Sequence, residues 1–314
     1  MSGDPGVVTV TPNLFIVGAP KAGTTALSTY LDRHPDIWVA PYEMIYFGSD
    51  LTVLDKAGKP RRLYEGFYRD TFAPHTEEHY RGDHSVTYLC SERAAQEIHD
   101  FEPGARIVAM VREPVEQMYS QHSELLFQGE EDIEDFAEAL AAEPARRRGE
   151  RIPRACRKPF LLEYRRVASY AEQLERYLTV FGPDRVHVVV FDDFAADTAS
   201  AYRGVLEFLG VDPGFAPGFE IVNPNKAVRS IRTRERLRAA PATMRRLGRL
   251  VVRDERRRAG LRRRIAELNT VQRPRPPLDP QLRRQLQEEM APGVQRLEGL
   301  LERELGGWRA APPA

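Results

Sequence analysis

The segment Asn13–Arg33, which reads NLFIVGAPKAGTTALSTYLDR, constrains the fold of this chain more than any other. It opens with an apolar run, Leu14–Gly18, of the kind that forms a strand buried on both faces. A short turn follows, and then a helix predicted over Gly23–Arg33, which His34-Pro35 ends. A strand, a glycine-containing turn and a helix together direct consecutive backbone N–H groups at a phosphate or sulfate. The segment therefore predicts an anion-binding loop within an α/β fold.

The spacing of residues within this loop narrows the kind of anion. Gly18 and Gly23 are separated by four residues, as in the first part of the nucleotide-binding loop G-x-x-x-x-G-K-[ST]. Thr25 occupies the hydroxyl position, but Thr24 stands where the lysine belongs, and the lysine of the loop is Lys21. This displacement argues against a standard nucleoside triphosphatase loop. The alternative is a strand–turn–helix that binds nothing.

The rest of the chain alternates between expected strands and expected helices. Further strands are predicted at Asp36–Ala40, Arg106–Val111 and Val186–Phe191. Further helices are predicted at Ser91–Phe101, from Pro114 to about Gln128, and at Asp132–Ala142, Phe160–Phe181, Thr198–Leu209, Ser230–Leu268 and Pro280–Leu305. Ser91 is the expected N-cap of the first of these. The last is expected to be interrupted near Pro292. This alternation predicts an α/β fold with a central parallel sheet covered by helices on both faces, and a helical C-terminal extension.

Two segments are expected to be irregular. Leu51–His79 has no clean period and is expected to be irregular or partly helical. Glu143–Pro159 is charged, contains proline and is expected to be an exposed, mobile loop. A short segment, Arg81–Ser85, precedes the helix that begins near residue 91. We expect a single domain over residues 1–314, of which 215–314 is a mostly helical C-terminal part.

Composition and charge exclude several functions. The 314 residues carry 46 Lys and Arg against 46 Asp and Glu, so the whole molecule has no net charge to attract nucleic acid or an anionic membrane. No apolar run approaches the roughly 18 residues that a membrane span needs, and the N-terminal sequence lacks the pattern of a signal peptide. Cys90 and Cys156 lack metal-ligand spacing. We therefore expect a cytoplasmic protein that binds neither nucleic acid nor membrane.

A second candidate anion site follows the strand Arg106–Val111. Arg112 lies at the carboxyl end of that strand, and Ser120 comes eight residues later, in the helix that Pro114 opens. Ligands of parallel sheets bind at the carboxyl ends of the strands, so this pair and the Lys21 loop should share one edge. A guanidinium fork and a hydroxyl suit an oxyanion such as a phosphate monoester. Taken alone, Arg112 could equally pair with a neighbouring carboxylate.

Together these stretches resemble the sulfotransferases that use 3′-phosphoadenosine 5′-phosphosulfate (PAPS), in the branch with Golgi-type and bacterial members. The 5′-phosphosulfate loop of that family, P-K-x-G-T-T-x-L, stands here as Pro20–Leu27. The 3′-phosphate motif of the family, R-[ND]-P-x5-S, stands here as Arg112 through Ser120, with Glu113 in place of the small polar residue. The resemblance also covers Gly82–Tyr88, Phe208-Leu209-Gly210 and the ending from Pro277 through Trp308.

The resemblance implies a P-loop-containing fold and transfer of a sulfuryl group from PAPS to a hydroxyl or amine of a small-molecule or glycan acceptor. It implies that Lys21 contacts the bridging oxygen and the 5′-phosphate side of the leaving group. The 5′-phosphate would lie against Ala22, Gly23, Thr24 and Thr25, and the 3′-phosphate against Arg112 and Ser120. Family members also use a basic C-terminal loop at the 3′-phosphate, for which the candidates are Arg229, Arg232, Arg273 and Arg275. No metal is required, because a sulfuryl group carries less negative charge than a γ-phosphoryl group, so that N–H groups and one lysine can stabilise its transfer.

An acceptor group also needs a base. The segment Pro41–Gly48, P-Y-E-M-I-Y-F-G, is similar to the K-E-x-H-F-F segment of the family, in which the glutamate is the general base, and Glu43 falls on that position. Tyr42 replaces the lysine of that segment, and Ile45 replaces the histidine. His84, which matches a lysine of the glycan-modifying relatives, is a second candidate, either as another base or as a sulfate contact. A structural histidine is an equally good interpretation.

Two other functions also fit parts of the sequence. A P-loop kinase or nucleotide hydrolase would require G-K-[ST] and a Mg²⁺-binding aspartate, and a non-catalytic module could bind the product nucleotide PAP without turnover. The basic stretch Arg229–Arg264 would suit nucleic acid, but arginines interleaved with leucine at helical spacing favour a solvated face or a lid. Aromatic residues in Leu51–His79 favour a ring-bearing small acceptor over a long anionic polysaccharide. Neither the acceptor nor the oligomeric state follows from the sequence.

Overall fold

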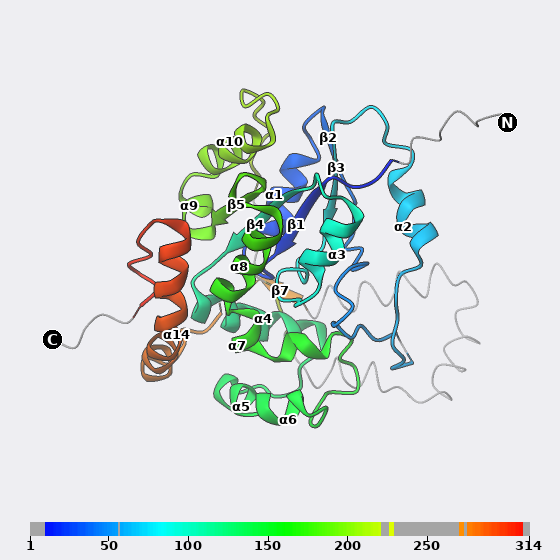
Figure 1. Ribbon diagram of the computed structural model, residues 1–314. Helices are drawn as coiled ribbons and strands as arrows, with labels where there is room; N and C mark the ends of the chain where they lie inside the picture. The colour runs from blue at the N-terminus through cyan, green and yellow to red at the C-terminus, as the bar shows by residue number, and fades with distance from the viewer. Residues whose placement is uncertain (1–9, 56, 221–225, 229–269, 273–274, 310–314) are drawn as a thin grey trace.

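The computed structural model describes residues 10–55, 57–220, 226–228, 270–272 and 275–309. Within this part of the chain, a five-stranded parallel sheet forms the centre of the molecule, in the order β2-β3-β1-β4-β5 (Figure 1). Its strands are β1 Leu14–Gly18, β2 Ile37–Val39, β3 Tyr80–His84, β4 Arg106–Val111 and β5 Val186–Val190. The predicted α/β fold with a central parallel sheet is confirmed.

The most apolar strands occupy the middle of the sheet. β1 lies between β3 and β4, where Leu14 pairs with Gly82 on one side and with Arg106 on the other. Every residue of β1 is buried, as are the last five of the six residues of β4. Because both faces of these strands are covered, they are continuous apolar runs rather than alternating ones.

The strand β3 is one that its sequence, YRGDH, does not reveal. The sequence predicts only a short segment there. Asp83 is fully buried in the structure and accepts hydrogen bonds from the hydroxyls of Ser85 and Tyr88, at 2.6 and 2.8 Å. Buried polar groups of this kind are satisfied by tertiary partners, so the apolar pattern that normally marks a buried strand is missing.

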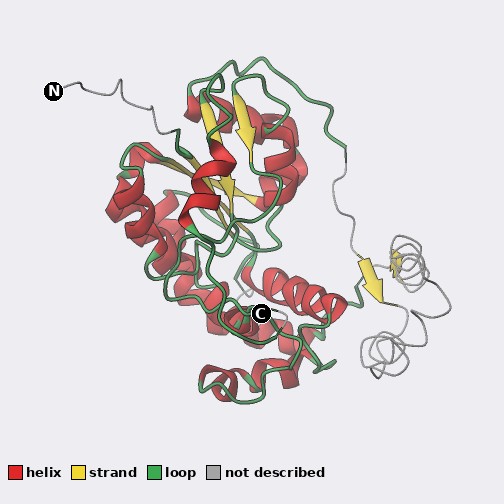
Figure 2. Ribbon diagram, turned by 90° about the vertical axis from the view of Figure 1, so that its right-hand side faces the viewer, coloured by secondary structure: helices red, strands yellow, loops and turns green. Residues whose placement is uncertain are grey.

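Helices alternate with the strands along the chain and cover both faces of the sheet (Figures 1 and 2). The helices are α1 Thr24–Leu31, α2 Glu65–Phe72, α3 Ala94–Phe101, α4 Pro114–Gln128, α5 Phe136–Ala141, α6 Glu143–Arg147, α7 Tyr164–Val167, α8 Tyr170–Phe181, α9 Phe191–Ala196, α10 Thr198–Leu209 and α14 Pro280–Leu301, with 3₁₀ turns η1 Pro159–Leu162 and η2 Pro183–Arg185. Away from the main sheet, β6 Lys226–Val228 pairs antiparallel with β7 Thr270–Gln272.

Two hydrogen bonds from buried tyrosines attach α8 and α10 to neighbouring parts of the chain. α1 and α10 lie together, and the hydroxyl of Tyr202 donates to the carbonyl of Tyr30 at 3.3 Å. α8 packs against α3, and the hydroxyl of Tyr177 in α8 donates to the carbonyl of Tyr88, in the turn after β3, at 3.0 Å. All four tyrosines are buried, and the hydroxyls of Tyr177 and Tyr202 each find an acceptor inside the protein.

The single helix predicted over Phe160–Phe181 is wrong, because the structure divides this segment into η1, α7 and α8. At the break between α7 and α8, the side chain of Gln173 donates to the carbonyl of Arg166 at 2.7 Å. A side chain thereby satisfies a carbonyl that a continuous helix would have bonded through its backbone. Amphipathic spacing alone does not show such a break.

The start of α3 also differs from the prediction. The helix begins at Ala94 rather than after Ser91. The Ser91 hydroxyl nevertheless accepts the backbone N–H groups of Arg93 and Ala94, at 3.1 and 2.9 Å. Ser91 therefore satisfies N–H groups at the helix start from a position two residues before the N-cap.

The segment Glu143–Pro159 begins with a helix that has two buried charged side chains, not with the exposed loop that its charge predicts. Glu143 and Arg146, both in α6, are each 3% exposed. Arg146 donates to Glu131 at 2.6 Å, and Glu143 accepts from Arg165 at 2.5 Å. Two of the charges that indicate a solvated loop are instead paired inside the protein with residues outside the segment, which a local reading of charge does not reveal. Residues 147–151 and 154 are exposed as predicted.

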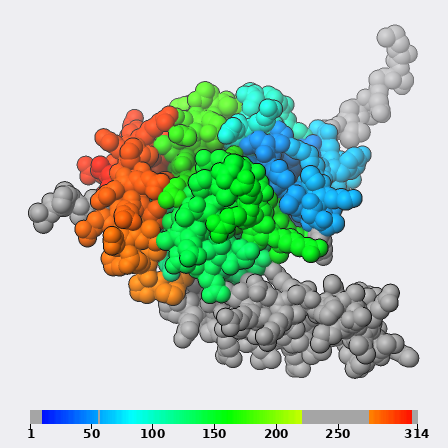
Figure 3. Space-filling model, turned by 90° about the horizontal axis from the view of Figure 1, so that it is seen from below, coloured from blue at the N-terminus to red at the C-terminus, as the bar shows by residue number. Residues whose placement is uncertain are grey.

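The C-terminal helix α14 packs against α8 and α4, and Figure 3 shows it in orange beside the green middle part of the chain. It starts with the Asp279 carboxylate accepting the N–H of Leu282 at 2.8 Å. The helix continues through Pro292, so the interruption predicted there is wrong. The helix predicted over Ser230–Leu268 lies outside the described residues. Among the described helices, none is long and apolar enough to cross a membrane.

Candidate active site

A cleft of about 700 Å³ opens at the carboxyl ends of β1 and β4. This is the edge at which parallel sheets bind ligands. The loop after β1, the helices α1, α4 and α9, and short stretches near residues 43, 87 and 158 form its walls. The walls include seven of the nine site residues predicted from sequence, which are Lys21, Gly23, Thr24, Thr25, Glu43, Arg112 and Ser120. Ala22 is buried beneath the loop, and His84 is also absent from the walls.

The loop after β1 takes a shape that requires glycine at two positions. Gly18 has a φ of 150°, and a Cβ there would lie 2.7 Å from the Cβ of Leu89. Gly23 has a φ of 90°, and a Cβ there would lie 3.1 Å from the ring of Phe191. Lys21 itself has a φ of 65°, in the left-handed region that non-glycine residues rarely adopt. This tight path brings the loop backbone close to the cleft.

The loop presents donors to the cleft from the start of α1. Gly23 is the N-cap of α1, so Thr24 and Thr25 belong to its first turn. The first N–H groups of a helix have no acceptor within the helix and attract anions. The Lys21 ammonium reaches Glu124 of α4, with 2.8 Å between Nζ and Oε2. A carboxylate therefore engages the loop lysine in this structure, a contact that the sequence did not indicate.

Arg112 lies beside this loop, as predicted. Its Nη1 donates to the carbonyl of Lys21 at 3.0 Å, and its guanidinium lies 4.5 Å from the centre of the Phe191 ring. Ser120 is buried in α4 and lines the same cleft. Phe191, the first residue of α9, was not singled out from the sequence, because an aromatic residue at the end of an apolar strand carries no local sign of function.

Arg275 is the described member of the four C-terminal arginine candidates; Arg229, Arg232 and Arg273 lie outside the described residues. Its Nη2 donates to Glu116 of α4 at 3.3 Å, and Arg112 also lies 3.7 Å from Glu116. The Nε and Nη1 atoms of Arg275 are buried and make no hydrogen bond within the described part of the chain. Burial, and then the charge of Arg112, lower the pKa of Arg275. Arg283 also pairs with Glu116, so three arginines share one carboxylate and leave guanidinium donors for a further anion.

Glu43 forms an ion pair across the cleft. Its Oε2 lies 2.7 Å from Nζ of Lys158, and the two side chains are 29% and 24% exposed. Lys158 comes from the segment predicted to be an exposed loop and was not a candidate. The residue Tyr42, next to the carboxylate, is 49% exposed, whereas Tyr46 stacks on Tyr68 at 4.2 Å.

A buried carboxylate anchors the backbone next to Glu43. Ser85 and Tyr88, whose hydroxyls donate to Asp83, also accept the backbone N–H groups of Ile45 and Tyr46, at 3.0 and 2.9 Å. Burial raises the pKa of Asp83 to about 6, against the lowering effect of these hydrogen bonds. The segment G-D-H-S-V-T-Y therefore connects β3 to the backbone that carries Glu43.

His84 does not reach the cleft wall, although the sequence suggested a catalytic role. It is 8% exposed, and its Nε2 makes no hydrogen bond within the described residues. Burial lowers the pKa of His84, while the charge of Glu43 raises it. A buried imidazole with a lowered pKa is neutral near pH 7.

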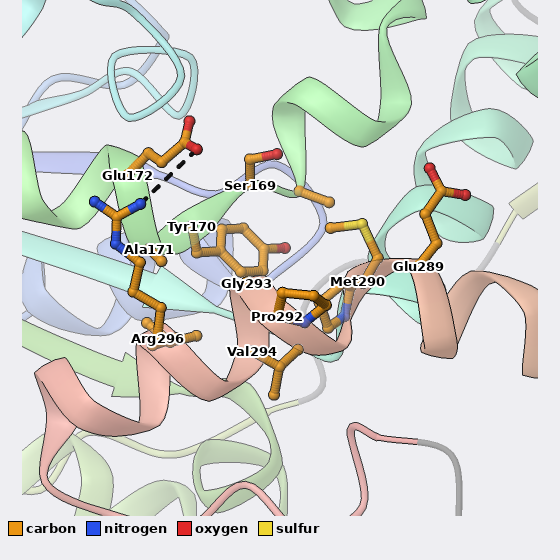
Figure 4. Close-up of a pocket in the computed structure, with 13 residues that line it drawn as sticks. Ser169, Tyr170, Ala171, Glu172, Glu289, Met290, Pro292, Gly293, Val294 and Arg296 are labelled. Carbon is orange, nitrogen blue, oxygen red and sulfur yellow. Dashed lines mark ion pairs between the residues drawn. The ribbon is translucent and has the colours of Figure 1, made fainter.

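A second cavity, of about 330 Å³, lies between α8 and α14 (Figure 4). Its walls contain none of the nine predicted site residues. Glu172 and Arg296 face each other at its rim, 4.0 Å apart, and the apolar residues Met290, Val294 and Leu297 line part of it. Because it lacks converging anion-binding groups, this cavity is not the candidate active site.

Within the described part of the chain, no group of three or more His, Cys, Asp or Glu side chains is arranged to hold a metal ion. Cys90 and Cys156 are buried and free. Burial raises the pKa of each thiol to about 12. A thiol with so high a pKa is protonated and a poor nucleophile near pH 7.

Comparisons with known proteins identify the family of the chain. The model of a sulfotransferase family matches residues 62–216. The crystal structure of a sulfotransferase from Alicyclobacillus acidocaldarius is 30% identical, with a TM-score of 0.70, and the match covers 95% of this chain and 99% of that one. The chain therefore belongs to the sulfotransferase family. The match to the family model includes Arg112 and Ser120 but not Lys21, whose place in the site rests on the geometry of the loop.

Curated relatives cover a smaller part of the chain. Human heparan sulfate glucosamine 3-O-sulfotransferase 5 is 24% identical over 204 residues, which is 64% of this chain and 54% of the relative. Human bifunctional heparan sulfate N-deacetylase/N-sulfotransferase 3 is 26% identical over 213 residues, which is 65% of this chain and 23% of the relative. The chain thus matches about half of the first relative and a quarter of the second.

Proposed function

We propose that the protein transfers a sulfuryl group from PAPS to a hydroxyl or amine of a small-molecule or glycan acceptor. The observation that carries this proposal is that the loop of Lys21 and the pair Arg112 and Ser120 line one cleft. The loop would form one anion site, and Arg112 with Ser120 would form the other. Two separate anion sites suit a nucleotide phosphorylated at both its 3′ and 5′ positions, and membership of the sulfotransferase family supports PAPS in particular.

The donor would use backbone and side-chain groups in different ways. The 5′-phosphate would accept the N–H groups of Thr24 and Thr25 at the start of α1. Lys21 would turn from Glu124 toward the oxygen that bridges sulfur and phosphorus, where charge develops as the bond breaks. Since the sulfuryl group carries little negative charge, these groups would stabilise its transfer without a metal.

The 3′-phosphate would lie between Arg112, Ser120 and Arg275. Among the four C-terminal candidates, we propose Arg275 because two of its buried guanidinium nitrogens make no hydrogen bond within the described residues. Arg112 and Arg275 share the carboxylate of Glu116, which partly offsets their mutual repulsion before an anion binds.

Glu43 would act as the general base. As the acceptor oxygen or nitrogen forms its bond to sulfur, the bond from sulfur to the 5′-phosphate oxygen breaks, and the acceptor proton passes to a carboxylate oxygen of Glu43. In-line transfer needs acceptor, sulfur and leaving oxygen in a row, so positioning should supply much of the rate. His84 stays a prediction, and its burial supports a structural role rather than direct contact with the sulfuryl group.

The identity of the acceptor is inferred less directly than that of the donor. The relatives are named for action on heparan sulfate glucosamine, which supports a glycan hydroxyl or amine. The cleft walls also contain aromatic rings suited to a base or a ring-bearing acceptor, namely Tyr30, Phe127, Phe191, Phe194 and Phe219. We further propose that residues 1–314 form one sulfotransferase domain and that the protein acts in the cytoplasm.

Calorimetry with PAP, ADP and 5′-AMP tests the proposed donor site. We expect PAP to bind at least about tenfold more tightly than ADP, because a further charge-assisted set of hydrogen bonds forms at the 3′ position. Mass spectrometry of acceptor panels incubated with PAPS should then find products heavier by one sulfuryl group. Equal affinity for PAP and ADP together with Mg²⁺-dependent ATP turnover would instead identify a kinase or hydrolase, and PAP binding with no product from any panel would favour a non-catalytic module.

A further inference from the structure

Lys158 is a cation of the cleft that the proposed donor site leaves without a role. Three cationic side chains line the described walls, namely Lys21, Arg112 and Lys158. The first two serve the leaving nucleotide in the proposed function. Lys158 lies instead beside Glu43, with 2.7 Å between Nζ and Oε2. It therefore marks the end of the cleft where the acceptor meets the sulfuryl group.

The backbone that carries Lys158 is held on both sides. The N–H of Arg157 donates to Glu130 at 3.1 Å, and the carbonyl of Arg157 accepts from Leu54 at 2.7 Å. The carbonyl of Lys158 accepts from Leu161 at 2.9 Å. These bonds fix the origin of the side chain, so the ammonium reaches the cleft from a set position rather than from a free loop.

The chemistry of the ammonium suits the transferring group. An ammonium has three N–H donors in rotatable positions, and the bond to Glu43 uses one of them. A transferring sulfuryl group has three non-bridging oxygens that can accept hydrogen bonds, and in the proposed function Lys21 serves the bridging oxygen instead. The buried His84 cannot supply this charge, because it lies outside the cleft wall.

We propose that Lys158 binds the transferring sulfuryl group at the acceptor end of the cleft while holding Glu43 in place. This assignment rests on the proposed function. Lys158 contributes donors and charge only: the bond from sulfur to the acceptor oxygen or nitrogen forms, the bond from sulfur to the 5′-phosphate oxygen breaks, and the acceptor proton goes to Glu43. The structure thus assigns one cation, Lys21, to the leaving oxygen and another to the oxygens that move with sulfur.

A comparison of PAPS with PAP tests this role without a known acceptor, because PAP lacks the sulfuryl group. Calorimetry of Lys158→Met should show about a tenfold loss of affinity for PAPS with the affinity for PAP unchanged. Lys158→Arg should retain most of the PAPS affinity, since it keeps the charge. Arg157→Met removes a neighbouring charge from the same backbone and should leave both affinities unchanged.

Removal of Lys158 also leaves the Glu43 carboxylate without its cation, and that unpaired charge repels the anionic PAPS. A second variant therefore separates this repulsion from the loss of a direct contact between Lys158 and the sulfuryl group. In the Glu43→Gln background, Lys158→Met should still lower the affinity for PAPS more than the affinity for PAP. If the loss disappears in that background, Lys158 acts only by neutralising Glu43, and the proposed contact is wrong. Equal losses for PAPS and PAP would show a structural role and likewise overturn it. Failure of the unaltered protein to prefer PAP over ADP would count against the proposed function itself.

Discussion

The two ends of the cleft are built from the chain in opposite ways. At the donor end, a single continuous segment supplies Lys21, Thr24 and Thr25, and its turn and helix shape the site through the backbone. At the acceptor end, the key contact joins Glu43 to Lys158, which are 115 residues apart in sequence. Anion binding by a loop and a helix start is a local property, whereas placing a base beside a cation depends on how distant segments pack.

We expect the largest single loss of activity from a substitution at the donor end of the cleft. Lys21→Ala should lower kcat by about 10³-fold, because it removes the charge that stabilises the leaving oxygen in the transition state. Turnover of PAPS with an acceptor found in the panel measures the effect. The exposed lysine Lys59 offers a matched control as Lys59→Ala. Near-normal turnover of Lys21→Ala would refute the assignment of the loop.

A substitution of Glu43 at the acceptor end should cause a smaller loss of activity than Lys21→Ala, and this loss should be confined to the chemical step. Glu43→Gln keeps the shape of the side chain but cannot take a proton, so kcat should fall by about 10²-fold. The affinity for PAP should stay unchanged, since the nucleotide does not contact Glu43 in the proposed site. Glu134→Gln, at an exposed position, serves as control. An unaltered kcat would remove Glu43 as the base.

Within the donor end, Arg112 should affect recognition of the 3′-phosphate specifically. Arg112→Ala should lower the affinity for PAP by about 10- to 100-fold, because hydrogen bonds to the charged 3′-phosphate are lost. The affinity for 5′-AMP, which has no 3′-phosphate, should change little. Calorimetry with both nucleotides measures the difference, and equal losses for the two would show that Arg112 merely supports the loop through its bond to the Lys21 carbonyl.

The smallest predicted effect concerns stability and tests how the acceptor end is anchored. The folded-state pKa of Asp83, about 6, exceeds the ordinary value near 4. The folded protein therefore holds a proton more tightly, and this contribution to stability is full below about pH 4 and is lost as pH rises through about 6. Asp83→Asn removes the titrating group and weakens three hydrogen bonds, from Tyr68, Ser85 and Tyr88.

Urea unfolding at several pH values measures this effect. Asp83→Asn should destabilise the protein by about 1–3 kcal/mol, and the difference from the unaltered protein should be larger near pH 4 than near pH 7.5. Asp70→Asn, at an exposed position, should show neither change. A difference that does not vary with pH would mean that Asp83 is not the titrating group. Retained stability at every pH would show that its hydrogen bonds do not hold the Glu43 backbone.

The parts of the fold that sequence predicted well are those with local causes. β1, β4, α4 and α10 have the expected bounds because buried strands are apolar runs, Pro114 starts a helix and Gly210 ends one. The wrong predictions have non-local causes. The charges of α6 are satisfied by Glu131 and Arg165 from elsewhere in the chain, and β3 is polar because the carboxylate of Asp83 is bonded by distant and nearby hydroxyls.

The candidate site divides in the same manner. The resemblance of short motifs placed Lys21, Arg112 and Ser120 at one edge, and the structure brings all three to one cleft. Arg275 could not be chosen from four arginines by sequence; it is the one that the structure describes, and there it is buried beside Glu116. Lys158 gave no signal at all, since a lysine in a charged run looks like any solvated one.

The sequence by itself determined the strand, turn and helix of the Lys21 loop in this sulfotransferase, because glycine spacing and a helix start specify where backbone N–H groups point. It also determined the central strands β1 and β4, because strands buried on both faces must be apolar. Only the tertiary structure decided that Lys158 faces Glu43, that Glu124 engages Lys21 and that His84 lies outside the cleft wall. These relations join residues far apart in the chain, and their energies depend on burial and distance, which exist only once the chain has folded.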